Sequence, residues 1–174
     1  MKTYFTLLCL LAYPVVSVAN VENLDRTQLI GKWSCFTSFK VNDLHITELS
    51  DSVIQADGIT LQKGMTSYKS NKEDAIFKYD MTSNWVLVGN NIKFSHLKVK
   101  DYSINNKNFD QKYNISTKLL DLVDKENNYK ILKMTDKEMV MSPEGYDIQE
   151  VCRKQEWFFK SILEKNRDLN LGFF

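Results

Sequence analysis

The feature that most constrains the fold is an alternation of apolar and polar residues with a period of two. It is clearest in the segments 32–40, 75–81 and 92–95. The residues that share the more apolar face are Trp33, Cys35, Thr37 and Phe39 in the first segment, Ala75, Phe77, Tyr79 and Met81 in the second, and Ile92 and Phe94 in the third. Because successive side chains of a strand point to opposite faces, this pattern predicts half-buried β-strands.

Short turn signals separate the alternating segments. Asp57-Gly58 is typical of a two-residue hairpin, because both positions accept a positive φ. Gly89-Asn90-Asn91 predicts a second tight turn, and Thr135-Asp136-Lys137 lies between two apolar segments as a hairpin tip would. We therefore predict an all-β fold, an antiparallel up-and-down barrel of about eight to ten strands, since closing the sheet removes its exposed edges.

Two segments follow a helical pattern instead. The stretch 23–30 predicts a short helical turn before the first strand, with Asp25 and Thr27 as candidate caps. From about residue 155 to 169, apolar residues recur at helical spacing and predict a C-terminal helix that packs on the outside of the barrel. The alternative for this helix is a partner-binding or membrane-surface role.

The N-terminus has the pattern of an export signal. Lys2 precedes an apolar stretch, 7–18, that is too short to span a bilayer as a helix, and Ala19 ends a run of small residues suited to a signal peptidase. We predict a signal peptide over 1–19, a single domain over 20–174, and a periplasmic or secreted protein. The alternative is an uncleaved membrane anchor.

The charge balance excludes some classes of partner. The chain has 23 Lys and Arg residues against 22 Asp and Glu, so loss of Lys2 leaves 22 of each. A neutral chain without long runs of one sign is a poor ligand for nucleic acid or for anionic lipid surfaces. We expect a monomer that does not bind nucleic acid.

Cleavage would also remove one of the three cysteines, Cys9. The two that remain, Cys35 and Cys152, form an even number in an oxidising compartment, which predicts a disulfide between the first and the last strand. The alternative is a pair of buried free thiols.

The segment Leu29-Ile30-Gly31-Lys32-Trp33 carries a resemblance to a known family. A short helical turn that runs into Gly-x-Trp at the start of the first strand resembles the calycin-type lipocalins, in particular small bacterial exported lipocalin-like domains. The resemblance implies structural roles for Gly31, for Trp33 at the closed end of the barrel, and for Arg153, which would pack across the indole as a cation–π contact.

No catalytic constellation is evident. The two histidines, His45 and His96, have no partner at metal-ligand spacing, and no nucleophile elbow, zinc-protease motif or phosphate loop is present. We therefore expect a protein that is not an enzyme and needs no cofactor or metal.

Large or flexible apolar side chains are the candidates for binding, because a barrel of this size can hold one small ligand or fill its own interior. The predicted ligand-binding residues are Phe77, Tyr79, Met81, Trp85, Phe94, Met134 and Met141. We expect an exported binding protein for a small apolar molecule such as a lipid or fatty acid; the alternative for these residues is plain core.

Two other functions are open. A solid barrel could act as an inhibitor or assembly factor that docks on an exported protein through loops, the C-terminal helix or the tail 169–174, which ends in two phenylalanines. A small outer-membrane barrel would need lipid-facing strands free of charge, whereas lysines recur in nearly every predicted strand.

Overall fold

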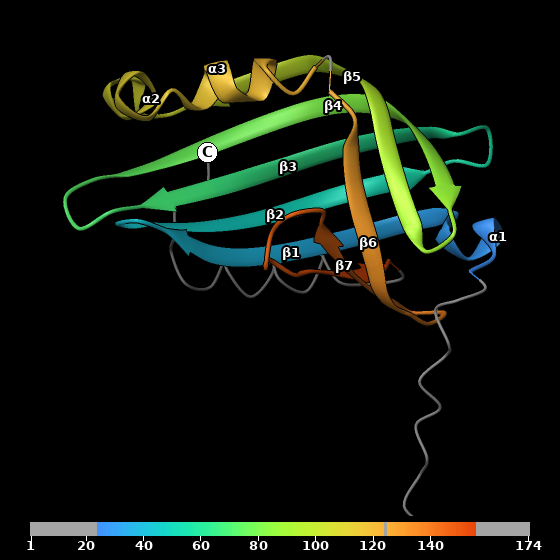
Figure 1. Cartoon of the computed structure of the whole chain (residues 1–174). Helices are drawn as coiled ribbons and strands as arrows, with labels where there is room; N and C mark the ends of the chain where they lie inside the picture. Colours follow the sequence, from blue (N-terminus) through green and yellow to red (C-terminus); the bar gives the residue numbers. More distant parts are fainter. Residues whose placement is uncertain (1–23, 124, 156–174) are drawn as a thin grey trace, which may run out of the picture.

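A computed structural model describes residues 24–123 and 125–155. The described chain forms a barrel with three short helices (Figure 1). The predicted signal peptide and nearly all of the predicted C-terminal helix lie outside the described residues.

Eight antiparallel strands make the barrel, and each pairs with the next in sequence. Pairing of the last strand with the first closes the sheet. The strands are β1 (Gly31–Val41), β2 (Leu44–Ile54), β3 (Ile59–Lys69), β4 (Asp74–Val88), β5 (Asn91–Ile104), β6 (Asn127–Met134), β7 (Glu138–Pro143) and β8 (Glu150–Lys154). The predicted up-and-down barrel is confirmed, with eight strands.

Alternation along the strands places the expected residues inside. Trp33, Cys35 and Thr37 of β1 are buried, as are Phe77 and Tyr79 of β4. The predicted tight turns at 57–58, 89–91 and 135–137 connect β2 to β3, β4 to β5 and β6 to β7. Period-two patterning and turn chemistry together therefore determine most of the topology.

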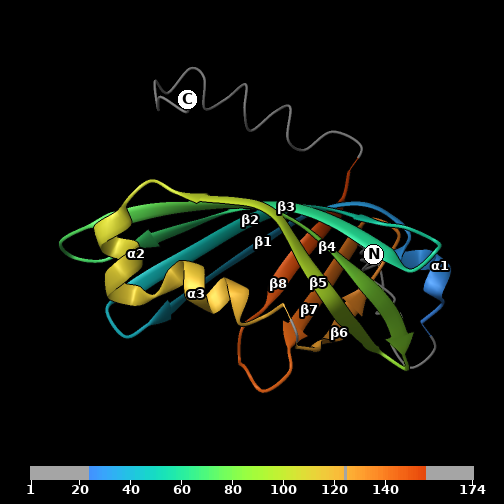
Figure 2. The ribbon, with the colours of Figure 1, turned by 90° about the horizontal axis from the view of Figure 1, so that it is seen from above.

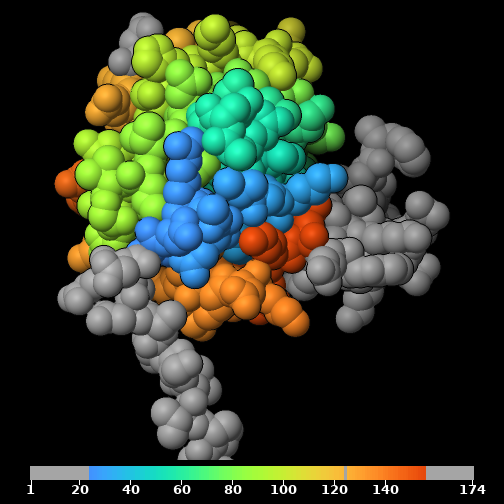
Figure 3. Space-filling view, turned by 90° about the vertical axis from the view of Figure 1, so that its right-hand side faces the viewer, coloured from blue at the N-terminus to red at the C-terminus, as the bar shows by residue number. Residues whose placement is uncertain are grey.

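One end of the barrel is closed by α1 (Arg26–Leu29), which Asp25 caps as predicted. Figure 3 looks onto this end and shows α1 lying across it. Two fully buried indoles lie beneath: Trp33 donates from Nε1 to the Leu29 carbonyl at 2.7 Å, and Trp85 donates to the Gln55 carbonyl at 3.0 Å. Trp33 therefore lies at the end of the barrel that α1 covers.

The cation over the Trp33 ring is not the predicted one. Nζ of Lys154 lies 5.2 Å from the ring centroid, whereas Arg153 is exposed and pairs in register with Ser34. The predicted role of Arg153 thus belongs to the next residue, because side chains alternate along β8 and only Lys154 shares the register of Trp33. Gly31 has a φ of +139°, a conformation that favours glycine.

The opposite end is covered by α2 (Lys107–Tyr113) and α3 (Ile115–Leu120), two helices that were not predicted. Figure 2 shows them along the barrel at the end remote from α1. Asn106 caps α2 by accepting from the Phe109 amide, and its amide group donates to the Asp74 carbonyl at the edge of β4. Phe109 is completely buried against the barrel end.

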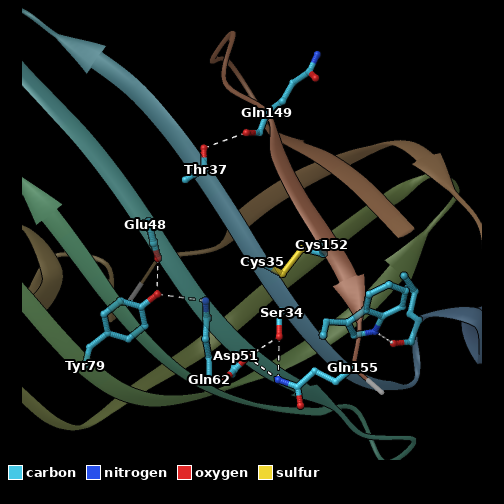
Figure 4. Close-up of a disulfide and its surroundings, with 12 residues drawn as sticks. Ser34, Cys35, Thr37, Glu48, Asp51, Gln62, Tyr79, Gln149, Cys152 and Gln155 are labelled. Carbon is cyan, nitrogen blue, oxygen red and sulfur yellow. Dashed lines mark hydrogen bonds between the residues drawn. A yellow bond between two sulfur atoms is a disulfide. The ribbon is translucent and has the colours of Figure 1, made fainter. Parts of the chain in front are cut away.

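The predicted disulfide is present. Cys35 and Cys152 are direct partners in the β1–β8 pair, 117 residues apart in sequence, and both are buried (Figure 4). That pair has only five aligned positions, so the disulfide reinforces the short seam at which the barrel closes. Such a bond is typical of proteins that fold in an oxidising compartment.

Within residues 24–123 and 125–155, no helix has the length and apolar character needed to cross a membrane.

Candidate functional site

The barrel interior contains a cavity of about 110 Å³. It lies alongside the core cluster that surrounds Trp33 and extends toward α3. Its lining is of mixed polarity: Trp33, Cys35, Ser52, Ile54, Thr60, Gln62, Met81, Ser83, Phe94, Leu97, Leu119, Leu122, Asn127, Tyr129, Met139, Met141 and Glu150. The interior is therefore neither completely filled nor purely apolar.

The predicted ligand-binding residues divide into two groups. Met81, Phe94 and Met141 border the cavity. The others pack elsewhere: Trp85 and Met134 belong to the core at the closed end, and Phe77 and Tyr79 to a second core beneath the helices. The structure thus brings three of the seven predicted residues to the cavity wall.

Glu150 is the one charged side chain among the described residues that border the cavity. It shares the inner face of β8 with Cys152, and its carboxylate lies within 4.8 Å of both disulfide sulfurs. Burial, reinforced by the nearby charge of Glu48, raises the pKa of Glu150 to about 8. Near neutral pH the free protein therefore holds Glu150 mostly as the uncharged acid.

A second acidic group, Glu48 of β2, pairs in register with the buried Thr37 of β1. It accepts a hydrogen bond from the Tyr79 hydroxyl, which in turn accepts one from Gln62 Nε2 at 3.4 Å (Figure 4). Burial raises the pKa of Glu48, and the bond from Tyr79 partly opposes that rise. Burial and the Glu48 charge raise the pKa of Tyr79 well above its usual value, so it remains a hydrogen-bond donor.

Gly64 makes room for this arrangement. It pairs with Tyr79 across β3 and β4, and the Tyr79 ring lies directly over it. A Cβ added at Gly64 would lie 2.2 Å from both Cζ and Oη of Tyr79, far inside van der Waals contact. Gly64 therefore determines where the tyrosine hydroxyl meets Glu48.

Replacing Gly64 with alanine is expected to lower the free energy of unfolding by about 2 kcal/mol, because the Tyr79 ring must move and its bond to Glu48 breaks. Urea unfolding measures the loss. The control is the same substitution in a Tyr79→Leu background, where the obstructing ring is absent and the penalty should shrink. An equal penalty in both backgrounds would contradict the steric account.

Aromatic and hydroxyl groups complete the wall. Phe94 and Tyr129 meet edge to face, with ring centroids 5.8 Å apart. Thr60 is only 2% exposed, and its hydroxyl has no hydrogen-bond partner within the described chain. A buried hydroxyl without a partner is costly, which makes it a ready contact for a polar group placed in the cavity.

The cavity approaches the surface where β5 and β6 separate. These strands pair at only four positions, from Asn91 to Phe94 of β5, and α3 lies beside the separation (Figure 2). Leu119 of α3 borders the cavity, as does Leu122, which is 39% exposed. The cavity wall therefore reaches the protein surface at Leu122.

One group of residues has the spacing of a metal site. Cys35, Cys152 and Glu150 offer ligand atoms within 4.8 Å of one another. Metals bind the thiolate, however, and both sulfurs are joined in the disulfide. In the oxidised protein this group therefore lacks the donors a metal needs.

Sequence reasoning missed the polar part of the site, chiefly Glu150, Glu48 and Thr60. A signal for Glu150 was present, because it precedes Cys152 by two residues and so must share its face of the strand. Glu48 lies in a strand whose inner face is half polar, which hides the alternation.

Comparison with protein-family models and with curated proteins gives no match. The eight-stranded up-and-down barrel is compatible with a lipocalin-like fold.

Proposed function

We propose that the protein is a binding protein that encloses one small molecule inside its barrel, beneath the α3 segment. The observation that carries the proposal is the cavity itself, which is bounded by side chains from β1 through to β8 and bordered by the buried Thr60 hydroxyl, which has no hydrogen-bond partner within the described chain. A barrel that holds no ligand would be more stable if apolar side chains filled that space.

The size of the cavity indicates a compact ligand. A protein cavity of about 150 Å³ holds a benzene molecule. The space here, about 110 Å³, suits a body of comparable or smaller size unless the α3 segment moves. This favours a small molecule, with an apolar body against Met81, Phe94 and Met141, over a long-chain lipid.

The predicted export agrees with this function. A disulfide across the barrel seam is typical of periplasmic and secreted proteins, and the signal peptide predicted over residues 1–19 would direct the chain there. In such a compartment the protein would carry or sequester its ligand without transforming it.

Native mass spectrometry of the mature protein, purified from its own compartment, tests the proposal. We expect the native mass to exceed the denatured mass by that of one small molecule. Ser52 is buried and borders the cavity, so Ser52→Leu should fill the space and abolish the excess, while Ser103→Leu, at an exposed position on β5, should leave it unchanged. Equal native and denatured masses for the unaltered protein would contradict the proposal.

A further inference from the structure

We propose that the molecule held in the cavity is a small organic cation, most simply a primary amine, whose ammonium group pairs with the Glu150 carboxylate. This inference rests on the proposed function and specifies its ligand class. It follows from the charge, the unpartnered polar groups and the aromatic wall of the cavity.

The charge of the cavity has one sign. Glu150 borders it, Glu48 lies close enough to perturb Glu150, and no Lys, Arg or His is among the described residues that line it. Within the described chain, the Glu150 carboxylate has neither a salt bridge nor a hydrogen bond. An anionic ligand such as a fatty acid would meet two acidic groups and no cation, whereas an ammonium group would supply the missing partner.

Groups independent of the acidic pair also suit an ammonium ion. The buried hydroxyl of Thr60 lacks a partner and can accept a hydrogen bond from it. The Phe94 and Tyr129 rings, 5.8 Å apart, border the same space, and the face of an aromatic ring attracts a cation. Methionines 81, 139 and 141 line the rest and suit an apolar body.

Binding of a cation must release a proton. The titratable groups that face Glu150 from other strands are Glu48 on β2, Tyr79 on β4 and Tyr129 on β6, and burial holds both tyrosines in the neutral form. Lys154, further along β8, is held at the closed end by the Gln28 carbonyl. Since the pKa of Glu150 is about 8, its acid form must lose its proton to solvent when the ammonium, which keeps its own proton, binds at neutral pH.

The test compares three molecules of similar size whose head groups differ in charge: n-butylamine, n-butanol and butyrate. Each is titrated into the mature protein while the backbone amide signals of cavity residues are followed by NMR. At pH 8.5 we expect saturable shifts with butylamine, binding weaker by about tenfold or more with butanol because it lacks the charge pair, and none with butyrate. Below pH 8 the butylamine affinity should fall about tenfold per pH unit, since an alkylammonium stays charged throughout this range.

Two variants assign the effect to Glu150. Glu150→Gln keeps the shape of the side chain and should weaken butylamine binding at pH 8.5 by about tenfold or more, removing its pH dependence while leaving butanol unchanged. Glu144→Gln makes the same charge change at an exposed position and should have no effect.

Equal binding of butylamine and butanol, stronger binding of butyrate, no binding of butylamine, or an unaltered affinity in Glu150→Gln would each overturn the cation inference. None of these results touches the proposed function, whose failure would appear separately as equal native and denatured masses.

Discussion

Replacing both Cys35 and Cys152 with alanine is expected to lower the free energy of unfolding by about 4 to 5 kcal/mol. The disulfide joins residues 117 apart, so it removes much of the freedom of the unfolded chain. In the folded state it lies in a strand pair with only five aligned positions, at the point where the barrel closes. Urea unfolding of the mature protein measures the loss.

Reduction provides the control for this prediction. A thiol reductant should destabilise the unaltered protein by a similar amount, and it should leave the double alanine variant unchanged because no disulfide remains. A loss below about 1 kcal/mol in the variant would mean that backbone pairing and side-chain packing alone hold the seam, and that the unfolded chain gains little freedom.

The disulfide also bears on the cavity. Glu150 is two residues from Cys152 on the same face of β8, so the bond between Cys35 and Cys152 determines the register that directs Glu150 inward. A slip of β8 by one residue would turn that carboxylate to the outside of the barrel. The double alanine variant is therefore expected to bind butylamine more weakly than its remaining folded fraction alone would explain.

The parts of the fold that depend on local rules were predictable from the sequence. Alternation in the first strand placed Trp33 and Cys35 inside, and Asp57-Gly58 located a hairpin because few other residue pairs adopt its backbone conformation. Helices α2 and α3 were missed, although Asn106 as a cap and the apolar pair Phe109 and Tyr113, four residues apart, carry a helical signal. A helix of seven residues is too short for this signal to outweigh the turn-forming residues on either side of it.

The candidate site was less predictable, because it depends on which residues meet across the barrel. Alternation singles out large apolar side chains, and four of the seven chosen do not border the cavity. Glu48 and Glu150 are 102 residues apart in sequence, and their proximity follows from the closure of the barrel, which no local pattern reveals. Likewise, Lys154 lies over the Trp33 ring because it pairs in register with Trp33, and the sequence alone does not reveal that register.

The unliganded protein is expected to lose stability as the pH rises from about 4.5 to 8. The pKa of Glu150 rises from 4.5 to about 8 on folding, so between these values the folded protein holds a proton that the unfolded chain has lost. The stabilisation that this bound proton gives the folded protein is fully present below about pH 4.5, declines as the pH rises, and is lost above about pH 8. A rise of this size corresponds to roughly 4 to 5 kcal/mol at most.

Urea unfolding at several pH values between 4.5 and 8.5 measures this dependence, and its assignment comes from comparing variants. Glu150→Gln cannot ionise, so its stability should decline much less over this range, and the exposed variant Glu144→Gln should follow the unaltered protein. Parallel curves for the unaltered protein and Glu150→Gln would show that Glu150 does not hold the proton. A bound amine should reverse the trend at high pH, because it stabilises the ionised carboxylate that the empty cavity destabilises.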